Sequence, residues 1–425
     1  MNQEERNAIR QLIQREVVLA TGCTEPGAVA LCVAKAREVL GTMPEQVELK
    51  LSKNVFKNAM GVGIPGTGMI GLPIAIAMAI TSGHSERGLE ILTISDQEIE
   101  EAKRWLVAHA EHIKIGVQDM CDKLFIECTC TAGNDTAVAT IAQRHTNFVL
   151  IKRNNETLLE NQTASVNSQT AGEGESLKLS VQKVYEYATT APIEEIQFIR
   201  ETVKYNTAAA TEGLKGYGLN VGRILMENAA NDIVHTVVAR TVAASDARMD
   251  GCLLSVYSNS GSGNQGIACT LPVYEYGVQK HCSEEQVTRA LIMSHLMSIY
   301  IKSGIGRLSA LCGIVNVSIG VASAITYLHG GSLENISFAI KNMINTLAGM
   351  VCDGAKPSCA LKMATGMYSA FVCSELAFNG KVVDATDGLS EKDVDYSIQN
   401  LGRLGHDGMN ETDDIVLDIM THKHI

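Results

Sequence analysis

Four cysteines stand on predicted turns or at predicted helix starts, where a thiolate can act as a metal ligand or a nucleophile. Cys352 and Cys359 bound the run CDGAKPSC, whose glycine and proline predict a turn that brings two sulfurs toward one centre. Cys312 follows GIGRLSAL at the start of a long apolar segment, and Cys23 precedes a proline that can open a helix. A helix N-terminus and a nearby arginine favour thiolate over thiol. Each cysteine alone is more often structural, but the four together indicate a functional set.

The spacing of these cysteines does not identify a metal by itself. Structural zinc sites usually carry two close C-x2–4-C pairs, and ferredoxins carry a compact cysteine run, and the sequence has neither. Scattered ligands fit a cluster inside a catalytic pocket better than an electron carrier. Cys128 and Cys130 are two residues apart in an apolar run, so on a strand they would share one face of a β core.

Two uncharged glycine-rich runs are candidates for substrate contacts. Residues 258–266 read SNSGSGNQG between two apolar segments, a position more typical of a binding loop than of a linker. Residues 61–68 read GVGIPGTG and match G-x-G-x-x-G, but polar residues precede the motif and a proline interrupts it. We therefore do not expect dinucleotide binding. A tight loop whose N–H groups approach a substrate carboxylate suits these glycines better.

Composition limits the class of protein. The net charge is −12 and no Lys/Arg run offsets it, which argues against nucleic-acid binding. The N-terminal residues predict an amphipathic helix and not a signal peptide. The apolar stretches 60–80 and 311–328 lack basic flanks and contain glycines or an asparagine, so we expect no membrane partner. A cytoplasmic protein with twelve reduced cysteines is the expectation.

The elements that must position these residues divide the chain in two. Residues 1–165 predict an α+β region, with β-like runs from about 113 to 159 and the turn AGND between two of them, which indicates antiparallel hairpins. We expect a linker or loop over 166–190. Residues 191–425 predict an all-α domain that carries the cluster cysteines, with helical periodicity, for example, over 221–244.

Five motifs occur in order along nearly the whole chain: GCTEP, KNAMGVGIPGTG, NSGSGNQG, GRLSALCG and CDGAKPSCALK. This set resembles the L-cysteine desulfidases, also called UPF0597 proteins, which are related to the α part of bacterial iron–sulfur L-serine dehydratases. The resemblance implies conversion of L-cysteine and water to pyruvate, ammonia and sulfide, without pyridoxal phosphate. It also implies a [4Fe–4S] cluster on Cys312, Cys352 and Cys359. Cys23 matches the GCTEP cysteine, which is a further ligand or a catalytic group.

The implied reaction assigns further roles. A cluster with three protein thiolates supplies Lewis-acid chemistry for the departure of sulfide. A base must take the Cα proton, and the candidates are Cys23 as thiolate and the neighbouring Glu25. The expected substrate contacts are Asn58, Gly66, Thr67, Ser260, Ser262, Asn264 and Gln265. The last five residues, THKHI, contain no cysteine, unlike the C-terminal cysteine that reaches the active site in related serine dehydratases.

Three alternatives remain open from sequence. The same cluster chemistry could act on a hydroxyl, as in an L-serine dehydratase. The chain could be a non-catalytic iron–sulfur or metal-binding protein, or a family member that has lost its cluster; the presence of all four cysteines and both loops argues against these two. We expect a small amino acid as the partner, and the sequence leaves homo-oligomerisation undecided.

Overall fold

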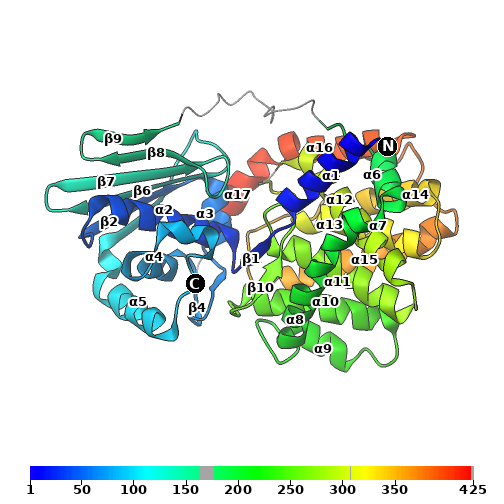
Figure 1. Cartoon of the computed structure of the whole chain (residues 1–425), viewed down its shortest axis with the longest axis horizontal. Helices are drawn as coiled ribbons and strands as arrows, with labels where there is room; N and C mark the ends of the chain where they lie inside the picture. Colours follow the sequence, from blue (N-terminus) through cyan, green and yellow to red (C-terminus); the bar gives the residue numbers. More distant parts are fainter. Residues whose placement is uncertain (162–176, 307, 423–425) are drawn as a thin grey trace.

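The computed structural model describes residues 1–161, 177–306 and 308–422, which form two bodies side by side (Figure 1). One body is mixed α/β and comes from the N-terminal part of the chain, and the other is almost entirely helical. The predicted fold class is therefore confirmed.

A six-stranded sheet forms one face of the α/β body. Its order is β5-β2-β6-β7-β8-β9, with β5 parallel to β2 and every other pair antiparallel. The strands are β2 (Gln46–Leu51), β5 (Ile113–Val117), β6 (Phe125–Ala132), β7 (Asp135–Ala142), β8 (Phe148–Arg153) and β9 (Glu156–Glu160). Cys128 and Cys130 on β6 are fully buried, which confirms their assignment to the β core.

Helices cover the sheet on one side. The apolar helix α2 packs directly on β6 and β7, and α4 and α5 pack behind it (Figure 1). The remaining elements of this body are short. Their bounds are α2 (Thr24–Leu40), α3 (Lys53–Ala59), β3 (Gly63–Ile64), β4 (Met69–Ile70), α4 (Leu72–Thr81), η1 (Ser85–Glu90), α5 (Asp96–His109) and η2 (Ala110–His112).

The helical body is built around α13, whose residues are apolar on nearly all sides and buried from Ile314 to Thr326. It packs against α11, α12, α14 and α15, as an all-round apolar helix must. The helices are α6 (Val181–Thr190), α7 (Ile193–Ile196), η3 (Gln197–Arg200), α8 (Glu201–Gly213), α9 (Val221–Glu227), α10 (Ile233–Met249), α11 (Gly263–Gln279), α12 (Glu284–Ile305), α13 (Gly313–Leu328), α14 (Leu333–Leu347), α15 (Cys359–Phe378), α16 (Val394–Arg403) and the π-turn η4 (Leu404–Gly408).

Both ends of the described chain cross between the bodies. Helix α1 (Gln3–Glu16) packs its buried Ile9 and Ile13 into the helical body, and β1 (Leu19–Thr21) pairs antiparallel with β10 (Ser255–Tyr257). Helix α17 (Asn410–Thr421) leaves the helical body and packs against α3 (Figure 1). Of the segment 166–190, expected to be a linker or loop, residues 166–176 lie outside the described part, and Val181–Thr190 forms α6.

Most of the two apolar stretches weighed as membrane spans lies in buried helices, although Met69 and Ile70 of the first stretch form the exposed strand β4. Residues 72–81 lie in α4, and 313–328 form α13. In the part of the chain that the structure describes, no helix combines the length and the apolar character needed to cross a bilayer.

Candidate functional site

Three of the four cysteines meet where α13 and α15 begin. Cys312 directly precedes α13, and Cys359 is the first residue of α15. Two backbone hydrogen bonds align Cys352 with Cys312: the Cys312 N–H donates to Met350 O at 2.9 Å, and the Cys352 N–H donates to Ala310 O at 2.7 Å. The two segments therefore run antiparallel, and the Cys312 thiol hydrogen-bonds the Cys352 sulfur.

The charge around these thiols favours one thiolate. The hydrogen bond from Cys312 lowers the pKa of Cys352 below the usual thiol range, and the Lys57 ammonium lowers it further. The same hydrogen bond, together with burial, raises the pKa of Cys312. Burial raises the pKa of Cys359, whose thiol donates to Gly354 O at 3.6 Å. A metal that binds here must displace the remaining protons, so binding will be pH-dependent.

The loop that carries Cys352 is held between the two bodies. Gly354 has φ +91°, and a Cβ at this position would lie 2.2 Å from Lys57 O on α3. The buried Lys57 side chain forms an ion pair with Asp413 of α17, which also accepts a hydrogen bond from Asn54 at 3.0 Å. Helices α3 and α17 therefore fix the position of the loop.

The donor set of this centre suits an iron–sulfur cluster. Among the described residues, no three His, Cys, Asp or Glu side chains are spaced to hold a single metal ion. A four-iron cluster holds its ligating sulfurs farther apart than one ion does, and thiolates are the ligands it uses. The three cysteines on turns and helix starts would supply thiolate ligands for such a cluster. The lysines beside them would compensate its negative charge.

Cys23 and Glu25 lie together at the start of α2. The Cys23 thiol donates to Glu25 Oε2 at 3.3 Å, and Asn58 Nδ2 of α3 donates to Glu25 Oε1 at 3.0 Å. Burial raises the pKa of Cys23 to about 12, and the Glu25 charge raises it too. Cys23 is therefore a thiol at neutral pH, which favours Glu25 over a Cys23 thiolate as the proton acceptor.

The glycine-rich loop leads into α11, whose first turn faces the cysteines. Asn264 Oδ1 accepts a hydrogen bond from the Arg248 guanidinium at 3.2 Å, and Gln265 Oε1 accepts from Asn316 Nδ2 at 3.1 Å. A Cβ on Gly313, the first residue of α13, would lie 2.7 Å from the Gln265 amide nitrogen. Gln265 therefore packs directly over the start of the helix that Cys312 precedes.

Other expected substrate contacts are engaged in their own turns. The Ser260 hydroxyl donates to its neighbour Asn259 at 2.8 Å, and Ser262 precedes α11 without capping it through its side chain. Gly66 and Thr67 lie in the turn between β3 and β4, where the Thr67 hydroxyl donates to Ile64 O at 2.8 Å. Of the expected contacts, the side chains of Asn58, Asn264 and Gln265 hydrogen-bond Glu25, Arg248 and Asn316, respectively.

Arg248 and His295 are residues of this region that the sequence motifs did not reveal. His295 is fully buried, and burial lowers its pKa to about 3, so its ring is neutral and Nδ1 accepts from Asn259 Nδ2 at 3.1 Å. Arg248 lies near the end of α10, between Asp246 and Asp250 and otherwise among apolar or small residues. The occurrence of an arginine in such a helix was the one sequence signal that could have singled out Arg248.

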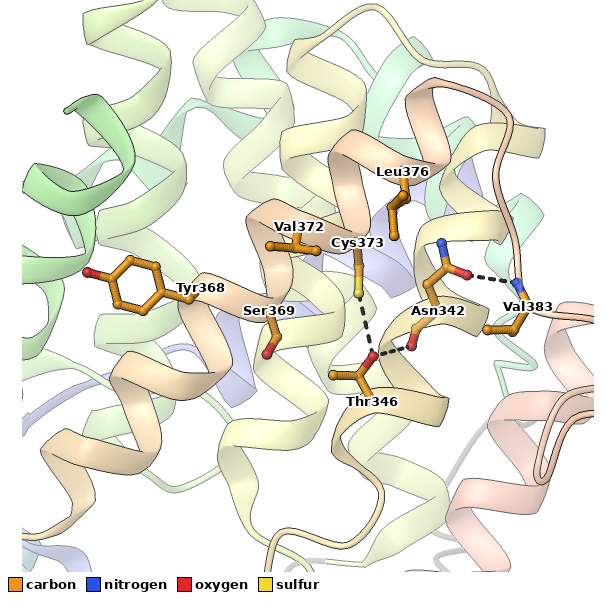
Figure 2. Close-up of a pocket in the computed structure, with 8 residues that line it drawn as sticks. All are labelled: Asn342, Thr346, Tyr368, Ser369, Val372, Cys373, Leu376 and Val383. Carbon is orange, nitrogen blue, oxygen red and sulfur yellow. Dashed lines mark hydrogen bonds between the residues drawn. The ribbon is translucent and has the colours of Figure 1, made fainter.

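A surface pocket elsewhere in the helical body does not belong to this site. It lies between α14 and α15, away from the start of α15, and Cys373 hydrogen-bonds Thr346 inside it (Figure 2). None of the expected site residues lines it.

The family model described as serine dehydratase alpha chain matches residues 86–418, and the chain belongs to this family of lyase-type enzymes, which includes iron–sulfur serine dehydratases.

Full-length relatives extend the match to the N-terminal motifs. The chain is 52% identical to a UPF0597 protein of Phocaeicola vulgatus, over 99% of this chain and 98% of the relative. It is 50% identical to a UPF0597 protein of Bacteroides fragilis and 44% identical to one of Porphyromonas gingivalis, each over the full length of both chains.

Proposed function

We propose that this chain is an iron–sulfur L-cysteine desulfidase, which converts L-cysteine and water to pyruvate, ammonia and sulfide without pyridoxal phosphate. The observation that carries the proposal is the meeting of Cys312, Cys352 and Cys359. Gly354, in the same loop, lies against Asn58 of α3, whose amide binds Glu25 of the Cys23–Glu25 pair. These three cysteines would hold a [4Fe–4S] cluster, which supplies a Lewis-acidic iron for the leaving sulfur.

The protein groups handle the proton and the orientation of the substrate. Glu25 takes the Cα proton, and Asn58 fixes the carboxylate of Glu25 through its 3.0 Å hydrogen bond. Cys23, as a thiol, donates to the other oxygen of that carboxylate. Loss of the proton and of sulfide leaves aminoacrylate, which water converts to pyruvate and ammonia.

L-Serine dehydration is the second candidate, because the matching family model is described as serine dehydratase alpha chain. The two substrates differ in one atom, and their similar shapes allow a pocket only modest discrimination. A thiolate ligand suits iron better than an alcohol does, so we expect the metal centre to favour L-cysteine.

The test is an anaerobic assay of protein reconstituted with iron and sulfide. Pyruvate formation is measured with L-cysteine and with L-serine. We expect a much higher kcat/KM for L-cysteine, with one sulfide released for each pyruvate formed. Equal turnover of L-serine would promote the serine dehydratase reading. A colourless protein with tightly bound stoichiometric zinc and no pyruvate from either substrate would refute the proposal.

A further inference from the structure

Arg248 is a buried cation with unused hydrogen-bond donors. Its side chain is 7% exposed, and its guanidinium donates to Asn264 Oδ1 at 3.2 Å and to Gly22 O at 3.0 Å. Its Nε has no partner among the described residues, and no carboxylate there forms an ion pair with the guanidinium within 4.0 Å. Both acceptors are neutral, so the positive charge lacks a direct counter-ion.

Two helix starts lie beside this charge. Gly263 begins α11, and a Cβ there would lie 2.2 Å from Arg248 Nε, so the guanidinium lies against that helix start. Gly22 lies one residue before Cys23, the N-cap of α2. Helix N-termini carry partial positive charge, and a buried cation between two of them is unfavourable unless an anion joins it.

Asp246 and Asp250 lie two residues from Arg248 in the chain, and Asp246 accepts a hydrogen bond from the Gly222 N–H at 2.8 Å. Among the described residues, neither forms an ion pair with the guanidinium within 4.0 Å. Glu25 binds Cys23 and Asn58, and Arg248 acts on this pair only through its field, which lowers the pKa of Cys23 against the larger effect of burial. A small anion could instead use the free N–H groups of Arg248. The guanidinium fork matches a carboxylate, which it can bind through two hydrogen bonds.

The position of Arg248 also fits the geometry of an amino acid. On one side, Gly22 connects it to Cys23, which lies beside the proposed base Glu25. On the other side, Asn264 connects it to Gln265, which packs over the start of α13 next to Cys312. Arg248 therefore contacts both the segment that leads to Cys23 and the segment that packs over the start of α13.

We propose that Arg248 is the anchor for the α-carboxylate of the amino-acid substrate. The identity of the ligand rests on the proposed function, whereas the anion site rests on the buried charge alone. Small α-amino carboxylates should bind, and the corresponding amides should not, because a neutral amide gives the cation no counter-charge.

The test uses cluster-free protein, so that binding is read without turnover. Calorimetry or ligand-observed NMR with L-alanine, which has no leaving group, should show binding to the wild type, and L-alaninamide should bind at least about tenfold more weakly. Arg248→Gln should weaken L-alanine binding by roughly 10- to 100-fold. Arg248→Lys keeps the positive charge but loses the two-pronged guanidinium. Its affinity for L-alanine should lie between those of the wild type and Arg248→Gln. Arg240→Gln on the same helix, whose arginine pairs with Glu275, is the matched control and should bind L-alanine normally.

Three results would overturn the proposal: no L-alanine binding to the wild type, equal binding of L-alaninamide, or unchanged binding in a folded Arg248→Gln variant. The comparison of the two ligands on the wild type decides the matter even if the Arg248 variants do not fold. Reconstituted wild type is assayed for sulfide in parallel. Sulfide release without Arg248-dependent binding would reject only the anchor, and Arg248-dependent binding without sulfide or pyruvate release would reject only the proposed reaction.

Discussion

The hydrogen bond from Cys312 and the Lys57 ammonium lower the pKa of Cys352, whereas the same bond and burial raise the pKa of Cys312 and favour its retaining a proton. Iron would replace that proton, so each cysteine of the centre should be needed for the cluster. We expect Cys312→Ala, Cys352→Ala and Cys359→Ala each to lose both the cluster and activity after anaerobic reconstitution, measured as bound iron and acid-labile sulfide.

The matched controls are the β-core cysteines. Cys128→Ala and Cys130→Ala remove buried sulfurs from β6 and should cost only packing, about 1–2 kcal/mol of unfolding free energy, with full iron content. Normal iron in any variant of the first three would show that the residue replaced is not a ligand.

Glu25 and Cys23 can be separated as candidates for the base. Glu25→Gln removes the proton acceptor and should lower kcat by roughly 10²- to 10⁴-fold, with iron content unchanged. Cys23→Ser keeps a donor to Glu25 and should cost less. A larger loss of kcat in Cys23→Ser than in Glu25→Gln, at full iron content, would make Cys23 the base. An altered cluster spectrum in Cys23→Ser before substrate is added would make it a fourth ligand.

The sequence could single out a site residue where the residues next to it in the chain predict a turn or a helix start. Cys312 and Cys359 could be singled out because turn residues and apolar runs around them predict helix starts, and the structure has those helices. The role of Arg248 could not be predicted, because its contact with Gly22 joins segments far apart in the sequence.

The loop between Val351 and α15 depends on one glycine at the contact between the bodies. Gly354→Ala would place a Cβ 2.2 Å from Lys57 O, at a φ of +91° that already disfavours alanine. We expect the loop to move off α3, and the protein to lose iron as well as stability. Iron is measured after reconstitution, and stability by denaturant unfolding.

Gly330→Ala is the matched control for this prediction. Its φ is +84°, but nothing lies within 4 Å of its added Cβ. It should lose about 1–2 kcal/mol of unfolding free energy from the backbone conformation alone and retain full iron. If the two variants retain the same iron content, the contact between Gly354 and α3 does not position the ligands.

The predicted helices and strands match the observed ones where hydrophobic periodicity and turn residues agree. The β-like runs from Phe125 onward form the antiparallel strands β6 to β9, as AGND and its neighbours indicated. The first run, Ile113–Val117, is instead β5, which pairs parallel with β2. The single helical stretch expected over 221–244 is instead α9 and α10, separated after Glu227. Periodicity continued across the break, but the Asp232 side chain accepts from the His235 N–H and starts a new helix.

The two bodies are joined by α17, whose buried Asp413 pairs with Lys57. Asp413→Ala would leave the Lys57 ammonium buried without its partner, a change that typically costs about 3–5 kcal/mol. Denaturant unfolding should show this loss. Asp414, also on α17, forms an exposed ion pair with Lys53 of α3. Asp414→Ala should change the free energy of unfolding by less than about 1 kcal/mol. Equal effects of the two variants would mean that the buried pair does not stabilise the contact between the bodies.

The arrangement of the whole molecule was the least accessible to sequence. Hydrophobic periodicity shows that α1 and α17 are amphipathic, but it cannot show which body receives their apolar faces. Helix α1 packs into the helical body and α17 against α3. The loop that follows Cys352 lies against α3 of the other body, and Asn58 of α3 binds Glu25.

The dependence of sulfide release on cluster content tests the central claim most directly. Protein is reconstituted anaerobically to several levels of iron, and the initial rate of sulfide release from L-cysteine is measured at each level. We predict a rate that rises in proportion to the content of four-iron cluster, with one pyruvate formed for each sulfide, and no release from the cluster-free protein. Sulfide release that is independent of iron content, or none at full cluster occupancy, would contradict the account.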